Sequence, residues 1–171
     1  KVHSDSRGFK LTGQLGDVMQ ESASIAYSYI SSHLDQYGAK TDYFNKSHVH
    51  LHVPDGATPK DGPSAGITIG IALLSLARNR RISRPLAMTG ELTLTGRVLP
   101  IGGVREKTIA ARRQNIKELI FPAENRKDFD ELPEYIREGI SPHFVGHFDE
   151  VAEIISPLKT TQSCPSPHEP T

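Results

Sequence analysis

A serine stands where a buried helix is expected to begin. Residues 59–66 read PKDGPSAG, with Ser64 near the end of this loop. Pro63 suits the first helical position, and the apolar run that continues to Ala77 predicts a buried helix. Free N–H groups and the positive end of the helix dipole would stabilise an oxyanion formed beside Ser64. The alternative is an ordinary helix start, where serine is common.

A lysine stands near the expected start of a later helix. Lys107 follows the pair Gly102-Gly103 and falls in the first turns of a predicted helix from Val104 to Gln114. A helix N-terminus disfavours an ammonium and lowers the pKa of lysine, and burial acts in the same direction. A neutral amine is a competent general base for a serine that lacks a histidine partner. The alternative is a surface lysine in an Arg-Glu-Lys run.

A phosphate-binding loop is a third use of the turn at Gly62–Gly66, because helix N-termini bind anions. The P-loop pattern, in which a glycine is followed after four residues by Gly-Lys-Ser or Gly-Lys-Thr, is absent here. A small phosphate- or nucleotide-binding domain therefore lacks a suitable lysine spacing.

Hydrophobic periodicity predicts a mixed α/β (α+β) fold, a compact single domain of interleaved short strands and helices. Residues 1–8 are expected to be frayed, 9–156 to form the domain and 157–171 to be a disordered tail. The expected strands are 9–12, 48–53, 86–94, 98–101, 118–121 and 141–146. The expected helices are 15–38, 63–77, 104–114, short helices within 125–138 and a last one at 149–155.

Bulk composition narrows the function classes. The chain has 171 residues, which suits one domain, and its 20 basic and 20 acidic residues cancel. A neutral balance argues against a dedicated nucleic-acid binder, and no apolar run reaches the roughly 20 residues of a membrane helix.

The single cysteine, Cys164, cannot close an internal disulfide. Because the chain begins at Lys1 without a signal-peptide pattern, we expect a piece of a longer protein. A group of arginines could bind nucleic acid, but a solvated surface or a contact between subunits of a ring is the preferred interpretation: Arg78, Arg80, Arg81, Arg112 and Arg113.

Several longer motifs resemble the Lon protease family, in the same order, over about Leu11 to Ile155. They are TGQLGDVM at 12–19, HLHVPDGA at 50–57, PKDGPSAG at 59–66, AMTGE at 87–91 and VLPIGG at 98–103, followed by Lys107. The resemblance implies that Ser64 and Lys107 form a Ser-Lys dyad. The form of the serine motif resembles the soluble A-type branch. The fold implied is the Lon-type α/β domain, assembled as a six-membered ring around an inner chamber.

Supporting residues follow from the same resemblance. Thr89 and Glu91 match the MTGE motif and are expected to help position Lys107, on one face of the predicted strand. Asp61 is expected to shape the substrate loop. The alternating His48, His50 and His52 share a strand face and are three possible zinc ligands. A structural role in the strand is preferred, and no metal is expected.

The function implied is that of an ATP-dependent serine endopeptidase that degrades unfolded or damaged proteins. The chain has no phosphate-binding lysine loop, so no cofactor is expected in this domain, and ATP and Mg²⁺ are expected only in an ATPase module absent from it. The expected partners are protein substrates and five further copies in a homo-hexamer, without membrane or nucleic acid. A bacterial cytoplasm or a mitochondrial matrix fits. A non-catalytic assembly module that kept the fold is the alternative.

Overall fold

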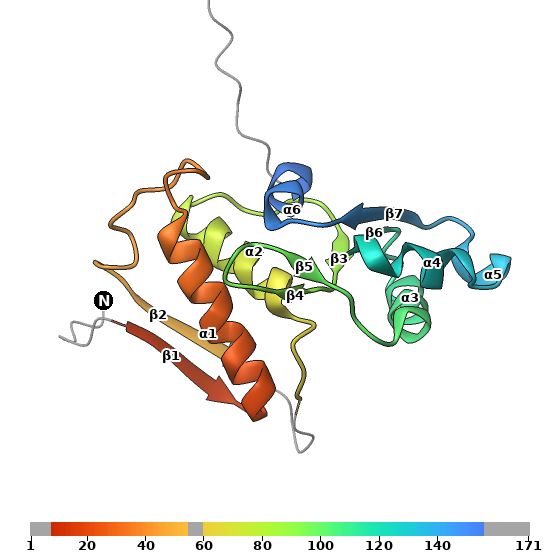
Figure 1. The fold of residues 1–171 in the computed structure, drawn as a ribbon, viewed down its shortest axis with the longest axis horizontal. Coiled ribbons are helices and arrows are strands. Elements are labelled where there is room, and N and C mark those ends of the chain that lie inside the picture. The colour runs from red at the N-terminus through yellow and green to blue at the C-terminus, as the bar shows by residue number, and fades with distance from the viewer. Residues whose placement is uncertain (1–7, 55–59, 156–171) are drawn as a thin grey trace, which may run out of the picture.

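The computed structural model describes residues 8–54 and 60–155, shown in colour in Figure 1. The expected disordered tail, 157–171, and all of the expected frayed segment except Gly8 lie outside the described residues. The described part is a mixed α/β domain, as predicted, with interleaved short strands and helices.

The N-terminal half is a two-stranded sheet covered by a helix. Strand β1 (Gly8–Gly13) runs parallel to β2 (His48–Val53), with Phe9 opposite Val49 and Leu11 opposite Leu51. These four side chains pack on the main core, while the alternate residues face outward. Helix α1 (Asp17–Ser32) lies over this sheet and packs against α2 (Gly66–Ala77), as Figure 1 shows.

Helix α1 is shorter than the predicted helix from 15 to 38. It ends at Ser32, and turns follow as far as Gly38, which has a φ of 69°. The Ser32 hydroxyl donates to the carbonyls of Ser28 and Tyr29, and the ring of His33 also contacts Tyr29 O. In a continuing helix the His33 N–H would donate to Tyr29 O, but it donates to Ile30 O at 3.2 Å instead, and the His33 ring contacts Tyr29 O.

The C-terminal half is built on a three-stranded parallel sheet in the order β3-β6-β7. The strands are β3 (Leu86–Met88), β6 (Glu118–Pro122) and β7 (Ser141–Val145). The accompanying helices are α3 (Val104–Arg113), the 3-10 turn η1 (Ala123–Asn125), α4 (Arg126–Asp130), α5 (Glu134–Arg137) and α6 (Phe148–Ile155).

Two hydrophobic cores meet at strand β6. Ile120 belongs to the larger core, which contains α1, α2 and α6. Leu119 and Phe121 belong to a smaller core with α3, α4 and α5. Alternate residues of a strand point to opposite faces, so β6 separates the two cores and supports both.

The predicted strand from 86 to 94 is wrong, because it is two strands in different sheets. Strand β3 pairs with β6, whereas β4 (Glu91–Leu92) pairs antiparallel with β5 (Val98–Leu99). The break falls at Gly90, where a Cβ atom would lie 2.7 Å from a Val98 methyl group and 3.1 Å from an Ile67 methyl group. Here the backbone turns from the sheet toward α2. No local pattern encodes such a long-range approach.

Candidate active site

Ser64 lies in the turn directly before α2. The helix begins at Gly66, three residues later than predicted, because the Gly66 N–H bonds to Pro63 O in a tight turn at 3.1 Å. The first α-helical bond runs from Ile69 N to Ala65 O at 2.9 Å. The N–H groups of the residues before Gly66 therefore precede the helical ladder at its positive end.

The main chain of Ser64 is held by the segment that breaks the predicted strand. The Gly90 N–H donates to Ser64 O at 2.9 Å, and the Thr89 hydroxyl donates to the same oxygen at 3.2 Å. Ile67 N–H in turn donates to Gly90 O at 3.2 Å. Thr89 is only 8% exposed, so this contact is sheltered from water. The observed partner of Thr89 is thus the serine main chain.

Asp61 fixes the loop before the serine to the start of α1. Its Oδ1 atom accepts hydrogen bonds from Met19 N at 2.9 Å and from Gly62 N at 2.8 Å. Gly16 N–H also donates to Lys60 O at 2.8 Å. A carboxylate beside the first turn of a helix both caps free N–H groups and complements the helix dipole.

Lys107 is the fourth residue of α3. Gly103 precedes this helix with φ 73° and ψ 33°, a left-handed conformation that glycine adopts at little cost. The Lys107 N–H donates to Gly103 O at 3.0 Å. Val104 and Thr108, on either side, are buried, and Lys107 itself is half-buried. Lys107 therefore lies at the edge of the buried face of the helix.

Asn125 fixes the loop that leads into α3, a role that the sequence did not reveal. Its side chain accepts from Ile101 N and donates to Ile101 O, both at 2.9 Å. Asn125 is 3% exposed, and its amide also donates to Asp128. A buried asparagine pairing with one residue's two backbone groups acts as a short strand partner. An asparagine between Pro122 and a charged helix is the only local signal.

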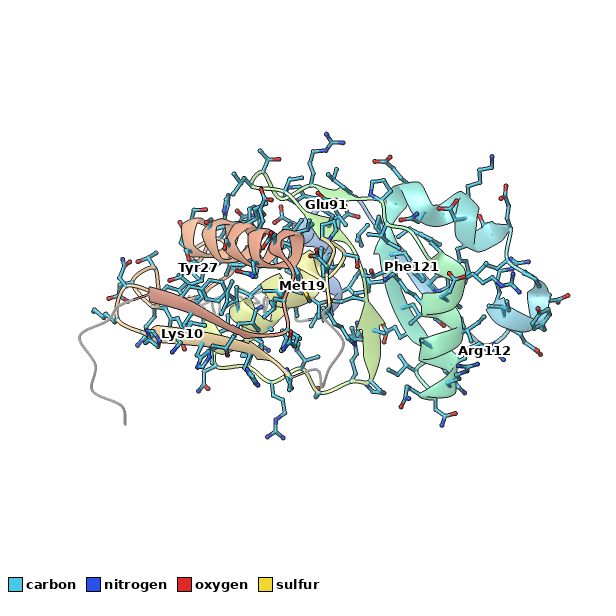
Figure 2. The ribbon with its side chains drawn as sticks, turned by 90° about the horizontal axis from the view of Figure 1, so that it is seen from below. Lys10, Met19, Tyr27, Glu91, Arg112 and Phe121 are labelled. Atoms are coloured by element: carbon cyan, nitrogen blue, oxygen red, sulfur yellow. The ribbon has the colours of Figure 1, made fainter. Side chains whose placement is uncertain are left out.

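An open cavity of about 430 Å³ brings Ser64 and Lys107 together. It lies between the start of α2, strands β3 and β6, and helix α3. Besides Ser64 and Lys107, its lining consists of Ala65, Thr68, Ala87, Met88, Thr89, Ala110, Ala111, Gln114, Ile116, Leu119, Ile120 and Phe121. The lining is mainly apolar, and Figure 2 shows Phe121 and Arg112 in the C-terminal half that carries α3.

The predicted supporting residues separate in the structure. Thr89 lines the cavity with Ser64 and Lys107, whereas Glu91 and Asp61 do not. The expectation that Thr89 and Glu91 share one strand face is wrong, because Thr89 follows β3 and Glu91 starts β4. Within the described part of the chain, no hydrogen bond joins the side chains of Ser64 and Lys107.

The alternating histidines lie on the outer face of β2. The Thr12 hydroxyl is hydrogen-bonded to His50 Nε2 at 2.7 Å and to His52 Nδ1 at 2.8 Å. Among residues 8–54 and 60–155, no group of three or more histidine, cysteine or acidic side chains could hold a metal ion. The two rings thus contribute to the pairing of β1 with β2.

The fold and the cavity define a class: a mixed α/β domain with a serine hydroxyl and a lysine amine on one apolar cavity. The family described as Lon protease (S16) C-terminal proteolytic domain matches residues 1–157, so the chain belongs to this family of serine peptidases. This finding confirms the resemblance that the motifs indicated.

Individual relatives agree with the family match. The chain is 68% identical over 163 residues, or 95% of its length, to Lon protease 2 of Hydrogenovibrio crunogenus. It is 63% identical over 145 residues, 85% of its length, to Lon protease of Magnetococcus marinus. It is 55% identical over 153 residues, 90% of its length, to the mitochondrial Lon protease homolog of Rattus norvegicus. The chain spans 19%, 18% and 16% of these proteins, respectively.

The relatives come from bacteria and from mitochondria. None of the helices in the described part of the chain has both the length and the apolar character needed to cross a membrane.

Proposed function

We propose that Ser64 is the nucleophile and Lys107 the general base of peptide-bond hydrolysis. The observation that carries this proposal is their common cavity: two residues from separate elements, and from opposite sides of a core boundary, line the same apolar space. A nucleophile and a base on one cavity are the minimum machinery for acyl transfer.

The reaction proceeds in two acyl transfers. Ser64 Oγ attacks the substrate carbonyl carbon while its proton passes to the neutral Lys107 Nζ. The tetrahedral intermediate then expels the amine, which takes that proton from Lys107 as the C–N bond breaks. Water next attacks the acyl-serine ester and gives a proton to Lys107 Nζ. Collapse returns the proton to Ser64 Oγ and releases the new carboxyl terminus.

The oxyanion of each intermediate requires hydrogen-bond donors that are already in place. The backbone N–H groups of Ser64 and Ala65 stand ahead of the helical ladder of α2, where the helix dipole also favours negative charge. The bonds from Thr89 and Gly90 to Ser64 O hold this peptide segment rigidly. Thr89 therefore acts as a positioning residue for the nucleophile, and Asp61 positions the loop before it.

The lack of a hydrogen bond between the Ser64 and Lys107 side chains, within the described residues, is compatible with this role. Catalytic hydrogen bonds are often long without substrate and tighten when the substrate excludes water. Lys107 is the only charged residue among the described residues that line the cavity. An entering substrate would displace water from the space between the two side chains.

The larger function is inferred from the relatives and from the resemblance. We place this domain in an ATP-dependent Lon-type protease that degrades unfolded or damaged proteins as a homo-hexamer. ATP and Mg²⁺ would act in an ATPase module outside this chain, and the domain itself would need no cofactor. A bacterial cytoplasm or a mitochondrial matrix would house it. We propose neither a membrane nor a nucleic acid as a partner; the balance of basic and acidic residues argues against a dedicated nucleic-acid binder.

Covalent labelling tests the nucleophile directly. A fluorophosphonate should phosphonylate Ser64, and peptide mapping by mass spectrometry should find the added mass on the peptide that contains it. Ser64→Ala should remove the label, whereas Ser24→Ala, on the exposed face of α1, should keep it. A label that persists in Ser64→Ala would refute the nucleophile. A folded wild-type chain that takes no label would favour the non-catalytic assembly module instead.

A further inference from the structure

The cavity beside Ser64 extends along one face of α3. Lys107, Ala110, Ala111 and Gln114 all line it, and their spacing places them on the same side of a helix. Lys107 and Gln114 are two turns apart, about 10 Å along the helix axis. The cavity therefore extends beyond the two proposed reacting groups, and Gln114 lines it about two helical turns from Lys107.

The lining is suited to an apolar side chain of considerable size. The small side chains Ala110 and Ala111 leave room beside α3, and Leu119 and Phe121 provide apolar contacts from β6. None of the described lining residues is acidic, so a lysine or arginine of the substrate would enter without a counter-charge. The volume of about 430 Å³ exceeds the space that a small side chain would fill.

Gln114 is a polar residue of the mainly apolar lining, and its side-chain amide is free, among the described residues, to hydrogen-bond a ligand. The hydroxyls of Thr68 and Thr89 already donate to Met88 O and Ser64 O. The backbone N–H of Gln114 bonds to the carbonyls of the last turn of α3, which fixes where this residue stands. Its amide makes no hydrogen bond to any residue within 8–54 or 60–155, and it can both donate and accept.

We infer that Gln114 is a specificity-determining residue. Its amide hydrogen-bonds the polar tip of a large, otherwise apolar substrate side chain on the acyl side of the scissile bond. Tyrosine fits this description, with an aromatic body for the apolar walls and a hydroxyl for the amide. Phenylalanine fills the same walls but cannot bond to the amide, which stays hydrated because Gln114 is exposed. The inference rests on the proposed function, because the side chain enters this cavity only if Ser64 is the nucleophile.

Acylation by two matched esters tests this inference. The p-nitrophenyl esters of N-acetyltyrosine and N-acetylphenylalanine differ by one hydroxyl, and the burst of p-nitrophenolate reports acylation of Ser64. A neutral hydrogen bond should favour the tyrosine ester about fivefold in the wild type. In Gln114→Leu the two rates should become nearly equal. Gln114→Glu keeps an acceptor at this place and should retain the preference.

Arg113→Leu is the matched control, because Arg113 is an exposed neighbour on the same helix that does not line the cavity. It should retain the wild-type ratio. An unchanged ratio in Gln114→Leu, or a wild-type ratio of one or less, would overturn the inference and leave the nucleophile intact. If neither ester acylates Ser64 while the chain is folded, the proposed function fails and the inference fails with it.

Discussion

The segment that carries Ser64 and the segment that carries Lys107 are fixed in different ways. The serine main chain is bonded by Thr89 and Gly90, and its loop is bonded to α1 through Asp61. The lysine belongs to a regular helix whose position depends on Gly103 and on packing in the smaller core. The proposed nucleophile is thus held by hydrogen bonds to its own main chain, whereas the proposed base is placed only by the helix that carries it.

This difference follows from the boundary between the two cores. Ala65 and Met88 pack at the edge of the larger core, whereas Ala87 and Ala111 belong to the smaller one. The cavity opens where these surfaces meet, so the site forms only when both halves are correctly packed. If Ser64 and Lys107 react as proposed, their relative placement depends on the packing of both cores.

The largest effect is expected from replacing Lys107, the proposed base. Lys107→Arg keeps the positive charge and much of the length, but arginine is effectively never neutral in a protein. Lys107→Met keeps the packing of the stem and removes the amine. Both should lower the rate of Ser64 acylation by at least about 10³-fold. The measurement is the burst with an activated ester, and Lys117→Met, at an exposed position before β6, is the control. An arginine variant that acylates at nearly the wild-type rate would assign the base to another group.

A smaller effect is expected from loosening the nucleophile. Thr89→Val keeps the shape but removes the hydroxyl that donates to Ser64 O in a buried place. Acylation should fall about tenfold, because small misplacements of reacting groups are costly. Thr89→Ser retains the donor and should recover most of the rate. If Thr89→Val lowers the melting temperature but not the acylation rate, Thr89 is structural only.

The sequence was sufficient for elements whose pattern is local. The alternation in HVHLHV predicted β2, and the observed strand has the same bounds, His48–Val53. The buried helix α2 was recognised from its apolar residues, although its start was placed three residues early. The predicted helix from 104 to 114 corresponds to α3, which ends one residue earlier, at Arg113. These features depend on neighbours along the chain.

The contacts that build the site depend on residues far apart in sequence, which a single sequence does not reveal. The break at Gly90 results from its approach to Val98 and Ile67, and it separates Thr89 from Glu91. For the same reason the bond from Thr89 to Ser64 could not be predicted. The motifs predicted which residues react, a prediction that remains to be tested, whereas the structure was needed to show which of them line one cavity.

A still smaller effect on rate is expected at the loop anchor. Asp61→Ala removes the carboxylate that accepts from Met19 N in the first turn of α1 and from Gly62 N in the serine loop. Loss of such a cap costs about 1 kcal/mol of folding stability, which thermal unfolding should detect. Acylation should fall only a few-fold, because Thr89 and Gly90 still hold Ser64. Asp17→Ala, an exposed acid in the same turn, is the control. A loss of rate as large as that of Lys107→Met would show that Asp61 takes part in the chemistry.

The smallest effect on acylation is expected far from the cavity, at the contact between the end of α1 and α6. The Tyr37 hydroxyl donates to Asp149 Oδ1 at 2.5 Å and is also hydrogen-bonded to the Tyr29 hydroxyl at 2.8 Å. Burial raises the pKa of Tyr37, and the hydrogen bond to Asp149 raises it further. Burial also raises the pKa of Tyr29. Neither ring lines the cavity, so Tyr37→Phe should acylate at the wild-type rate.

The sign of the pH effect follows from these raised pKa values. In the unfolded chain a tyrosine ionises with a pKa of about 10, whereas folded Tyr37 stays protonated. The stability that this difference provides is complete below pH 10 and decreases as the pH rises above it, because only the unfolded state gains by ionising. The melting temperature of the wild type should therefore fall above pH 10. That of Tyr37→Phe should fall less steeply, and Tyr29 should account for part of the fall that remains.

At pH 7 the Tyr37→Phe variant should lose about 1–2 kcal/mol of folding stability, since it removes a hydrogen bond to a carboxylate. Tyr135→Phe, at an exposed position, should keep the wild-type slope. Equal slopes in Tyr37→Phe and the wild type would show that the phenol is not held neutral by the fold.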